Sequence, residues 1–162
     1  MLMRINDPRK TPFGKMLRDH AVITSWVAES RIEIDSARLV VLNAALAIDT
    51  KGPKASLIEI AQAKVLAPRA ALSVIDQAAQ AFGAAGVSQD TPLAAMWAGI
   101  RTLRLADGPD EVHLQQMGRL ENKRGEKVSE TIERQAEETE KLLARYGVQR
   151  LGIADGFSKA KL

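Results

Sequence analysis

Few residues of the types that most often do chemistry occur in this sequence, and they lie far apart. There is no cysteine, which excludes thiolate zinc sites, cysteine nucleophiles and disulfide bonds. The two histidines, His20 and His113, do not have the spacing of a metal site, so no metal centre is predicted. The remaining candidates are the carboxylate of Asp107, directly before Gly108-Pro109, and the basic side chain of Lys10.

Each candidate also has a purely structural interpretation. A carboxylate beside a Gly-Pro turn is common where a helix ends. A basic residue before a helix, such as Lys10, can bind a phosphate, although a solvated charge is the commoner case. The small residues from Gly83 to Gly86 can let the backbone approach a cofactor, or can simply form a tight connection between helices. The residues alone leave these alternatives open.

The elements that must position these residues are all predicted to be helices. Apolar residues recur at three- and four-residue spacing over three stretches, and Gly-Pro or Thr-Pro pairs separate them. The predicted helices cover residues 14–48, 54–82 and 91–107, and a fourth begins at Gly108-Pro109-Asp110-Glu111. No strand alternation appears, so the fold class is all-α. The short connections favour an up-down-up-down four-helix bundle.

The segment 123–146 is predicted to be an extra C-terminal helix. Nearly half of its residues are charged, while Val128, Ile132, Leu142 and Tyr146 belong to a narrow apolar seam at helical spacing. We expect this amphipathic helix to pack on the bundle or on a second subunit.

Composition limits the classes of partner. The chain has 162 residues, enough for a single core. Its net charge of +3 is spread along the sequence, and Glu and Arg alternate, so no nucleic-acid partner is predicted. The first ten residues are too polar for a secretory signal, and no apolar run reaches the length of a membrane span. We therefore expect an intracellular, soluble protein.

Three stretches of the sequence resemble one known family. They are SRIEIDSARLVVLNAALAID (30–49), EIAQAKVLAPRAA (59–71) and IDQAAQAFGAAGVSQDTPLAAMWAGIRTLRLADGPDEVH (75–113). Together they resemble the C-terminal domain of acyl-CoA dehydrogenases, most closely the branch of animal family members ten and eleven, which is often fused to a kinase-like domain. The string ADGPDEVH, with FGAAG at a fixed distance upstream, is highly specific to the family. The resemblance covers residues 13–121 and implies the same helical domain.

The resemblance implies a reaction and a catalytic residue. In the family, a flavin accepts a hydride from the substrate β-carbon while a carboxylate removes an α-proton, which introduces a double bond next to the thioester. The position that matches the family's catalytic Glu is Asp107. Aspartate is one methylene shorter than glutamate, so the acyl chain must lie closer or be bulkier, as a branched or hydroxylated chain would be.

The resemblance also implies flavin adenine dinucleotide (FAD) as the cofactor. Gln80 and the loop of Gly83, Ala84 and Gly86 match the stretch that lies along the adenine half of the flavin, often across a subunit boundary. The other positions that it assigns to the cofactor are Lys10, Phe13, Gly108, Pro109 and Glu111. Among them, Lys10 replaces an Arg that contacts the flavin phosphate, a contact that its neighbour Arg9 could also make. Pro109 has no amide to donate, and Glu111 is often Gln in relatives.

Relatives carry, upstream of this domain, a helical domain and a β-domain that hold the flavin ring and most of the acyl-CoA, and no such sequence is present here. Three hypotheses follow: a part of a dehydrogenase that needs a partner chain for activity, a non-catalytic helical dimerisation module, or a bundle recruited to an unrelated ligand. In each case we expect a homodimer or higher homo-oligomer. By itself the chain is not expected to oxidise acyl-CoA.

The predicted organisation is therefore a divergent segment at 1–13, the acyl-CoA dehydrogenase-like bundle at 14–122, the amphipathic helix at 123–146 and a tail at 147–162. The tail ends in Ala160-Lys161-Leu162, a small-basic-Leu tripeptide like the Ser-Lys-Leu peroxisomal signal. In a eukaryote this predicts a peroxisomal location, and otherwise a cytoplasmic one.

Overall fold

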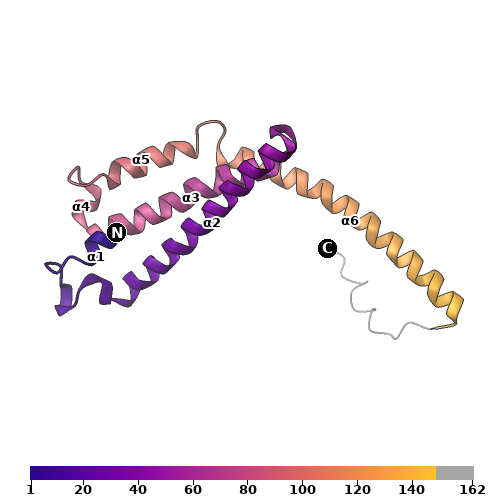
Figure 1. Ribbon diagram of the computed structural model, residues 1–162, viewed down its shortest axis with the longest axis horizontal. Helices are drawn as coiled ribbons and strands as arrows, with labels where there is room; N and C mark the ends of the chain where they lie inside the picture. The colour runs from indigo at the N-terminus through magenta and orange to yellow at the C-terminus, as the bar shows by residue number, and fades with distance from the viewer. Residues whose placement is uncertain (149–162) are drawn as a thin grey trace. The chain divides into compact units, whose positions relative to one another are not determined.

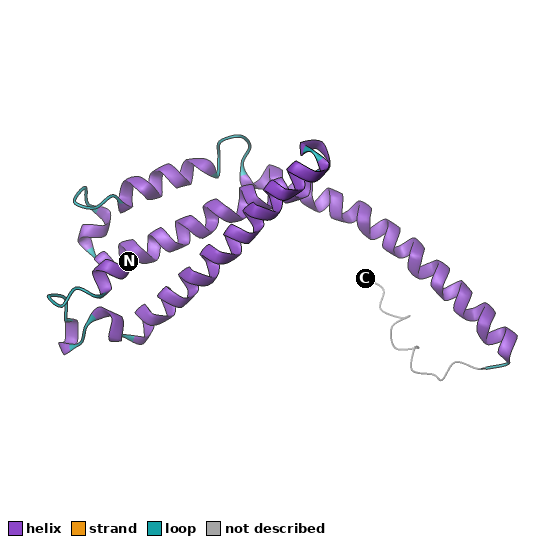
Figure 2. Cartoon of the chain, in the orientation of Figure 1, coloured by secondary structure: helices purple, strands orange, loops and turns teal. Residues whose placement is uncertain are grey.

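The computed structural model describes residues 1–148, and within them all regular secondary structure is helical (Figure 2). The predicted all-α class is thus confirmed. The helices are α1 (Leu2–Ile5), α2 (Ala21–Lys51), α3 (Leu57–Phe82), α4 (Ala84–Val87), α5 (Leu93–Leu103) and α6 (Asp110–Tyr146), with 3-10 turns η1 (Pro12–Gly14), η2 (Leu17–Asp19) and η3 (Pro53–Ala55). None of these helices combines the length and apolar character needed to cross a membrane.

The chain divides into two units, Met1–Arg119 and Leu120–Leu162. In the first unit α3 is the central helix, with α2 on one side of it and α5 on the other (Figure 1). The short helix α4 and the N-terminal helix α1 pack at the C-terminal end of α3. The four-helix bundle topology remains a prediction, because α2, α3 and α5 are the long helices that pack together within the described part of this unit.

Small side chains let α2 and α3 approach closely. The buried apolar residues of the two helices are mostly alanines: Ala44, Ala47, Ala61, Ala70, Ala78 and Ala81. Polar side chains also bridge the two helices, since Ser30 Oγ donates to Gln77 at 2.9 Å and Ser73 Oγ donates to Glu33 at 3.1 Å. These bonds fix the register of the two helices because each joins one position on α2 to one on α3.

Two predicted helix boundaries were wrong. The helix expected from residue 14 begins at Ala21, after two 3-10 turns, and the helix expected to reach residue 107 ends at Leu103. At the first boundary Lys15 and His20 have extended backbone angles, so α2 cannot begin before Ala21. Near the second boundary Asp107 has a φ of +55°, which does not occur in a right-handed helix.

No helix break occurs near residue 122, although the chain divides into its two units nearby, after Arg119. Helix α6 runs without interruption from Asp110 to Tyr146, so the expected extra helix is the second part of α6. Asn122 and Gly125 are poor helix formers, but unlike proline both have a backbone N–H that can donate within a helix. A glycine in a helix lowers its stability by only about 1 kcal/mol relative to alanine, so the helix can continue through both residues. The predicted peroxisomal tripeptide at residues 160–162 lies outside the described residues.

Candidate functional site

The turn between α5 and α6 holds Asp107 in an unusual conformation. Asp107 and Gly108 both have positive φ, +55° and +100°, and the Asp107 side chain is exposed. Aspartate is among the few residues with a side chain that occupy this region readily. The turn therefore presents the carboxylate to solvent instead of using it as a helix cap.

A buried carboxylate, Asp110, anchors this turn. Its Oδ2 accepts hydrogen bonds from Arg69 Nε on α3 at 2.9 Å and from Arg104 Nε at 2.8 Å, and its side chain is only 3% exposed. Burial alone raises the pKa of Asp110, but the hydrogen bonds and charges of the two arginines outweigh it and hold the pKa below its ordinary value. Asp110 is consequently ionised at neutral pH and joins the end of α5, the start of α6 and the middle of α3.

Two further groups fix the same turn. Lys64 Nζ on α3 donates to the carbonyl oxygen of Leu103, which closes the C-terminal end of α5. A Cβ on Gly108 would lie in a tight contact, 3.2 Å from His113 Nε2, and the φ of +100° favours glycine at this position. That ring nitrogen is buried and has no hydrogen-bond partner within the described chain. Glu111, which the resemblance assigned to the cofactor, is exposed one residue after the anchor.

A second group of the predicted residues lies at the C-terminal end of α3. Lys10, Gln80 and Gly83 line one open pocket of about 350 Å³, together with Arg4 and Arg9. The structure thus brings together three of the residues that the resemblance assigned to the cofactor, from segments about 70 residues apart in the sequence.

The three cations of this pocket have different roles. Arg4 donates to the carbonyl oxygens of Ala81 and Phe82, at 3.4 and 3.3 Å, and so caps α3. Arg9 is paired with Asp7 at 2.9 Å, and the hydrogen bond from Arg9 lowers the pKa of Asp7 to about 2. No side-chain hydrogen bond or ion pair involves Lys10 within the described residues, so its ammonium group is available to a ligand.

Backbone conformation and packing account for the two glycines that follow α3. Gly83 ends α3 with a φ of +65°. Gly86 is buried, and a Cβ added to it would lie 2.3 Å from the carbonyl oxygen of Ala79. The small residue at 86 is therefore required by the packing of α4 on α3. Ala84 is the exposed first residue of α4.

Phe13 is almost fully exposed. Its side chain is 95% exposed although its backbone is held at positive φ. Its ring makes an edge contact with the His20 ring at a centroid distance of 6.3 Å. A large apolar ring held out into solvent in this way is suited to contact with a partner or ligand.

The chain does not bring all the predicted residues into one site. Asp107 belongs to the turn anchored on Arg69, whereas Gln80 is eleven residues further along α3, roughly 16 Å along the helix axis. Within the described residues there is also no cluster of three potential metal-ligating side chains.

Sequence analysis did not predict the anchor of the Asp107 turn. It placed Asp110 only at the predicted start of a helix, and it gave no role to Arg69 or Arg104. The spacing of six residues between Arg104 and Asp110 across a Gly-Pro turn was a usable signal, but Arg69 comes from another helix and no local pattern points to it.

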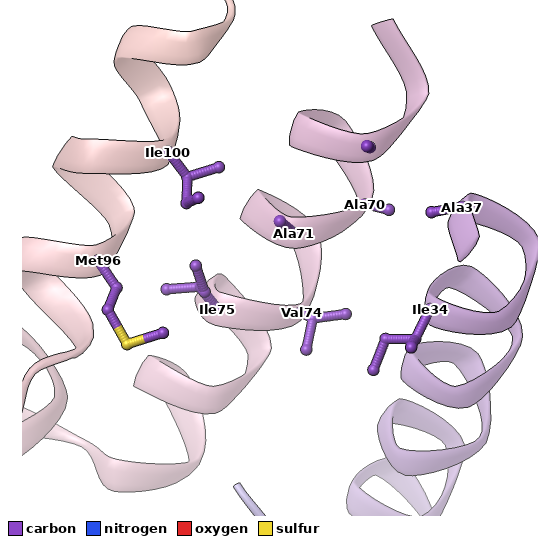
Figure 3. Close-up of a pocket in the computed structure, with 9 residues that line it drawn as sticks. Ile34, Ala37, Ala70, Ala71, Val74, Ile75, Met96 and Ile100 are labelled. Atoms are coloured by element: carbon purple, nitrogen blue, oxygen red, sulfur yellow. The ribbon is translucent and has the colours of Figure 1, made fainter. Parts of the chain in front are cut away.

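An apolar pocket lies between α2, α3 and α5 (Figure 3), and none of its lining residues belongs to either group. It has a volume of about 350 Å³ and is open to solvent. Its lining is entirely apolar and includes Ile34, Val74, Ile75, Met96 and Ile100, with alanines between them. It offers a surface for burial but no group that could do chemistry.

Comparison with known proteins decides what this arrangement is. A family model described as "Acyl-CoA dehydrogenase, C-terminal domain" matches residues 8–120. The chain belongs to the acyl-CoA dehydrogenase family. Acyl-CoA dehydrogenase family member 11 of Rattus norvegicus is 54% identical over 113 residues, which make up 70% of this chain and 14% of the rat protein. The predicted family and branch are confirmed.

Solved structures agree with this assignment. A putative acyl-CoA dehydrogenase from Mycobacterium abscessus is 44% identical, with a TM-score of 0.73 over 76% of this chain and 30% of that one. The FAD complex of PigA is 20% identical with a TM-score of 0.68, which shows a shared fold. The chain thus spans less than a third of the length of these proteins.

Proposed function

We propose that this chain contributes the C-terminal helical domain to flavin-dependent α,β-dehydrogenation of an acyl-CoA, with Asp107 as the base. The observation that carries the proposal is the exposed carboxylate of Asp107 on a turn anchored by Asp110, inside the segment that matches the family. A base must be held in a fixed place relative to the substrate carbon. The anchor provides that rigidity without using the Asp107 side chain.

The role of Asp107 is to take a proton from the α-carbon of the thioester. Its carboxylate is exposed in this chain, so the base strength needed for this step must come from the surroundings that exclude water once substrate is bound. The groups that hold the rest of the acyl-CoA are proposed to lie on protein that this chain does not include, either a partner chain or further sequence.

The residues at the end of α3 fit one part of FAD. The free ammonium group of Lys10 is suited to a phosphate, and the amide of Gln80 can donate and accept hydrogen bonds at its side. Bound flavin would supply the acceptor for the hydride that leaves the β-carbon. No described residue near Lys10 can enclose a flavin ring, so this pocket is proposed to hold only the phosphate and adenine part, with Phe13 as an exposed contact.

Flavin binding tests this assignment. We expect the full chain to bind FAD weakly, which can be measured as a change in the intensity or polarisation of FAD fluorescence. Lys10→Ala should weaken this binding by about tenfold, as expected for the loss of one charge-assisted contact. Lys15→Ala is the matched control, since Lys15 is an exposed lysine outside the pocket. Equal binding of both variants and the wild type would remove Lys10 from the site.

A homo-oligomer is the second part of the proposal. The apolar pocket of Figure 3 leaves Ile34 and Met96 45% and 48% exposed, and a second copy that packs over α2, α3 and α5 would bury them. The same pocket supports the alternative of a non-catalytic dimerisation module or a bundle that binds an unrelated apolar ligand. A dimer that lacks FAD binding and Asp107-dependent activity would favour the dimerisation module.

Location in peroxisomes is proposed from Ala160-Lys161-Leu162 alone. In a eukaryotic cell, a fluorescent protein fused to the N-terminus of the chain should form peroxisomal puncta, and deletion of Leu162 should disperse them. Diffuse fluorescence of the intact fusion would contradict the proposal and favour the cytoplasm.

A further inference from the structure

The second part of α6 carries a heptad pattern that the family function does not use. It lies outside the family match at residues 8–120, within the second unit of the chain. Over residues 128–146 the core positions of the heptad repeat every three and four residues. The a positions are Ile132, Thr139 and Tyr146, and the d positions are Val128, Gln135 and Leu142.

The apolar members of this seam are exposed. Val128 is 51% exposed, Ile132 59%, Leu142 54% and Tyr146 70%. They lie on one helix at intervals that place them on the same side. A run of exposed apolar side chains along one face indicates a surface that is buried by another molecule.

The distribution of charge indicates what kind of molecule that is. Between residues 128 and 146, six of the seven residues at the outward b, c and f positions of the heptad are charged. At the core and flanking positions a, d, e and g, only two of the twelve residues are charged, namely Glu138 and Arg145. A helix that packed on an acidic or basic partner would place charge beside its seam. Here the seam and both its flanks are almost uncharged, which suits an identical uncharged face.

The position of Glu138 distinguishes the two possible orientations. In a parallel pair in register, a g residue faces the e position of the following heptad, so Glu138 lies against the partner's Leu143. In an antiparallel pair that matches Ile132 with the partner's Leu142, Glu138 would face its own copy, and two like charges would repel each other. The β-branched Ile132 at a and Leu142 at d also favour a two-stranded parallel pair.

We propose that residues 128–146 form a parallel, in-register coiled-coil contact with the same segment of a second copy of this chain. The seam has fewer than three heptads, so the contact is expected in the micromolar range of concentration. The Gln135 and Thr139 layers pair with themselves by hydrogen bonds and oppose a shift of register. This contact is independent of the dehydrogenase activity and of any packing over the apolar pocket.

Single cysteines test the proposal, because the natural chain has none. The full chain with Val128→Cys should form a disulfide-linked dimer on mild oxidation at least tenfold faster than the chain with Glu130→Cys, whose side chain lies on the charged face. Adding Ile132→Lys to Val128→Cys should abolish the difference, while circular dichroism shows that the helix remains.

Other results would overturn the proposal. An antiparallel pair would leave Val128→Cys alone uncoupled and would instead give mixed dimers between Val128→Cys and Tyr146→Cys chains. Similar slow coupling of Val128→Cys and Glu130→Cys would show that the seam is covered by something other than a second copy of itself. The test compares the coupling rates of two positions on the same helix. A dimer formed through the first unit alone would not favour Val128→Cys over Glu130→Cys, so it would not produce the expected difference.

Discussion

At the scale of single residues, the site depends on a division of labour between two aspartates three positions apart. Asp107 is exposed at positive φ and has no side-chain hydrogen bond or ion pair within the described residues, whereas Asp110 is buried and bonded to two arginines. The first carboxylate is left available for the proposed role as a base, and the second holds the turn in place. Substitution of Asp107 should therefore affect activity, whereas substitution of Asp110 should affect stability.

Asp110→Asn should destabilise the first unit. An amide oxygen can still accept a hydrogen bond from Arg69 or Arg104, but the charge is lost, so we expect a decrease of about 1–3 kcal/mol in the free energy of unfolding. Chemical denaturation at neutral pH measures it. The neighbouring Glu111→Gln is the control, since Glu111 is exposed and should change stability by less than about 1 kcal/mol.

The same aspartate predicts a dependence on pH. Because the pKa of Asp110 is lower in the folded chain than in the unfolded one, its stabilisation is complete above the unfolded pKa of about 3.9 and is lost as pH falls through the folded pKa. The difference in stability between wild type and Asp110→Asn should therefore shrink below about pH 4. A difference that stayed constant down to pH 2 would show that Asp110 does not titrate as described.

Gly86 and Gly99 make a matched pair of helical glycines. A Cβ at 86 meets the backbone of Ala79, whereas a Cβ at 99 meets nothing within 4 Å. Gly86→Ala should lower the free energy of unfolding by about 1–3 kcal/mol through overpacking. Gly99→Ala should raise it by roughly 0.5–1 kcal/mol, because alanine is the better helix former. Equal effects would mean that α4 does not pack on α3 as the structure shows.

At the scale of elements, α3 is the scaffold for both groups of site residues. It supplies Lys64 and Arg69 to the turn of Asp107 and Gln80 to the pocket of Lys10. One group contacts the middle of α3 and the other its C-terminal end, roughly 16 Å apart along the helix axis, so a ligand that contacts both must be elongated. An acyl-CoA and a dinucleotide cofactor both have that shape.

Lys64→Met should loosen the end of α5 without disturbing the core. The lysine donates to the Leu103 carbonyl, and methionine keeps the side-chain length but cannot donate. We expect a loss of about 1 kcal/mol, and faster amide exchange in residues 101–106 than in the middle of α5. Lys54→Met is the control, because Lys54 is exposed on η3. Unchanged exchange at the turn would remove Lys64 from the anchor.

The elements also show how far the sequence was sufficient. Periodicity placed the end of α3 correctly at Phe82 and its start three residues early, because Gly-Pro before it and a glycine after it are strong local signals. It extended the next helix to Asp107, which adopts positive φ although it is not glycine. That turn is anchored by a contact from a distant segment, Arg69 to Asp110, which no local pattern contains.

At the scale of the whole molecule, the chain combines a family domain with a segment outside the family match. Residues 8–120 carry the fold and the proposed site, and they account for 14% of the length of the rat relative. The base and the phosphate pocket are therefore proposed to function only with protein that supplies the flavin ring site and the thioester site.

The most direct test of this account is acyl-CoA-dependent reduction of an electron acceptor, with FAD, by the full chain mixed with a polypeptide that carries the upstream domains of a close relative. We predict no turnover by the chain alone, turnover by the mixture, and a loss of at least about a hundredfold with Asp107→Ala, as expected for removal of a general base. Asp90→Ala, which removes an exposed aspartate outside the predicted site, should reduce turnover far less. Turnover of the mixture that is unchanged by Asp107→Ala, or turnover by the lone chain, would contradict the account.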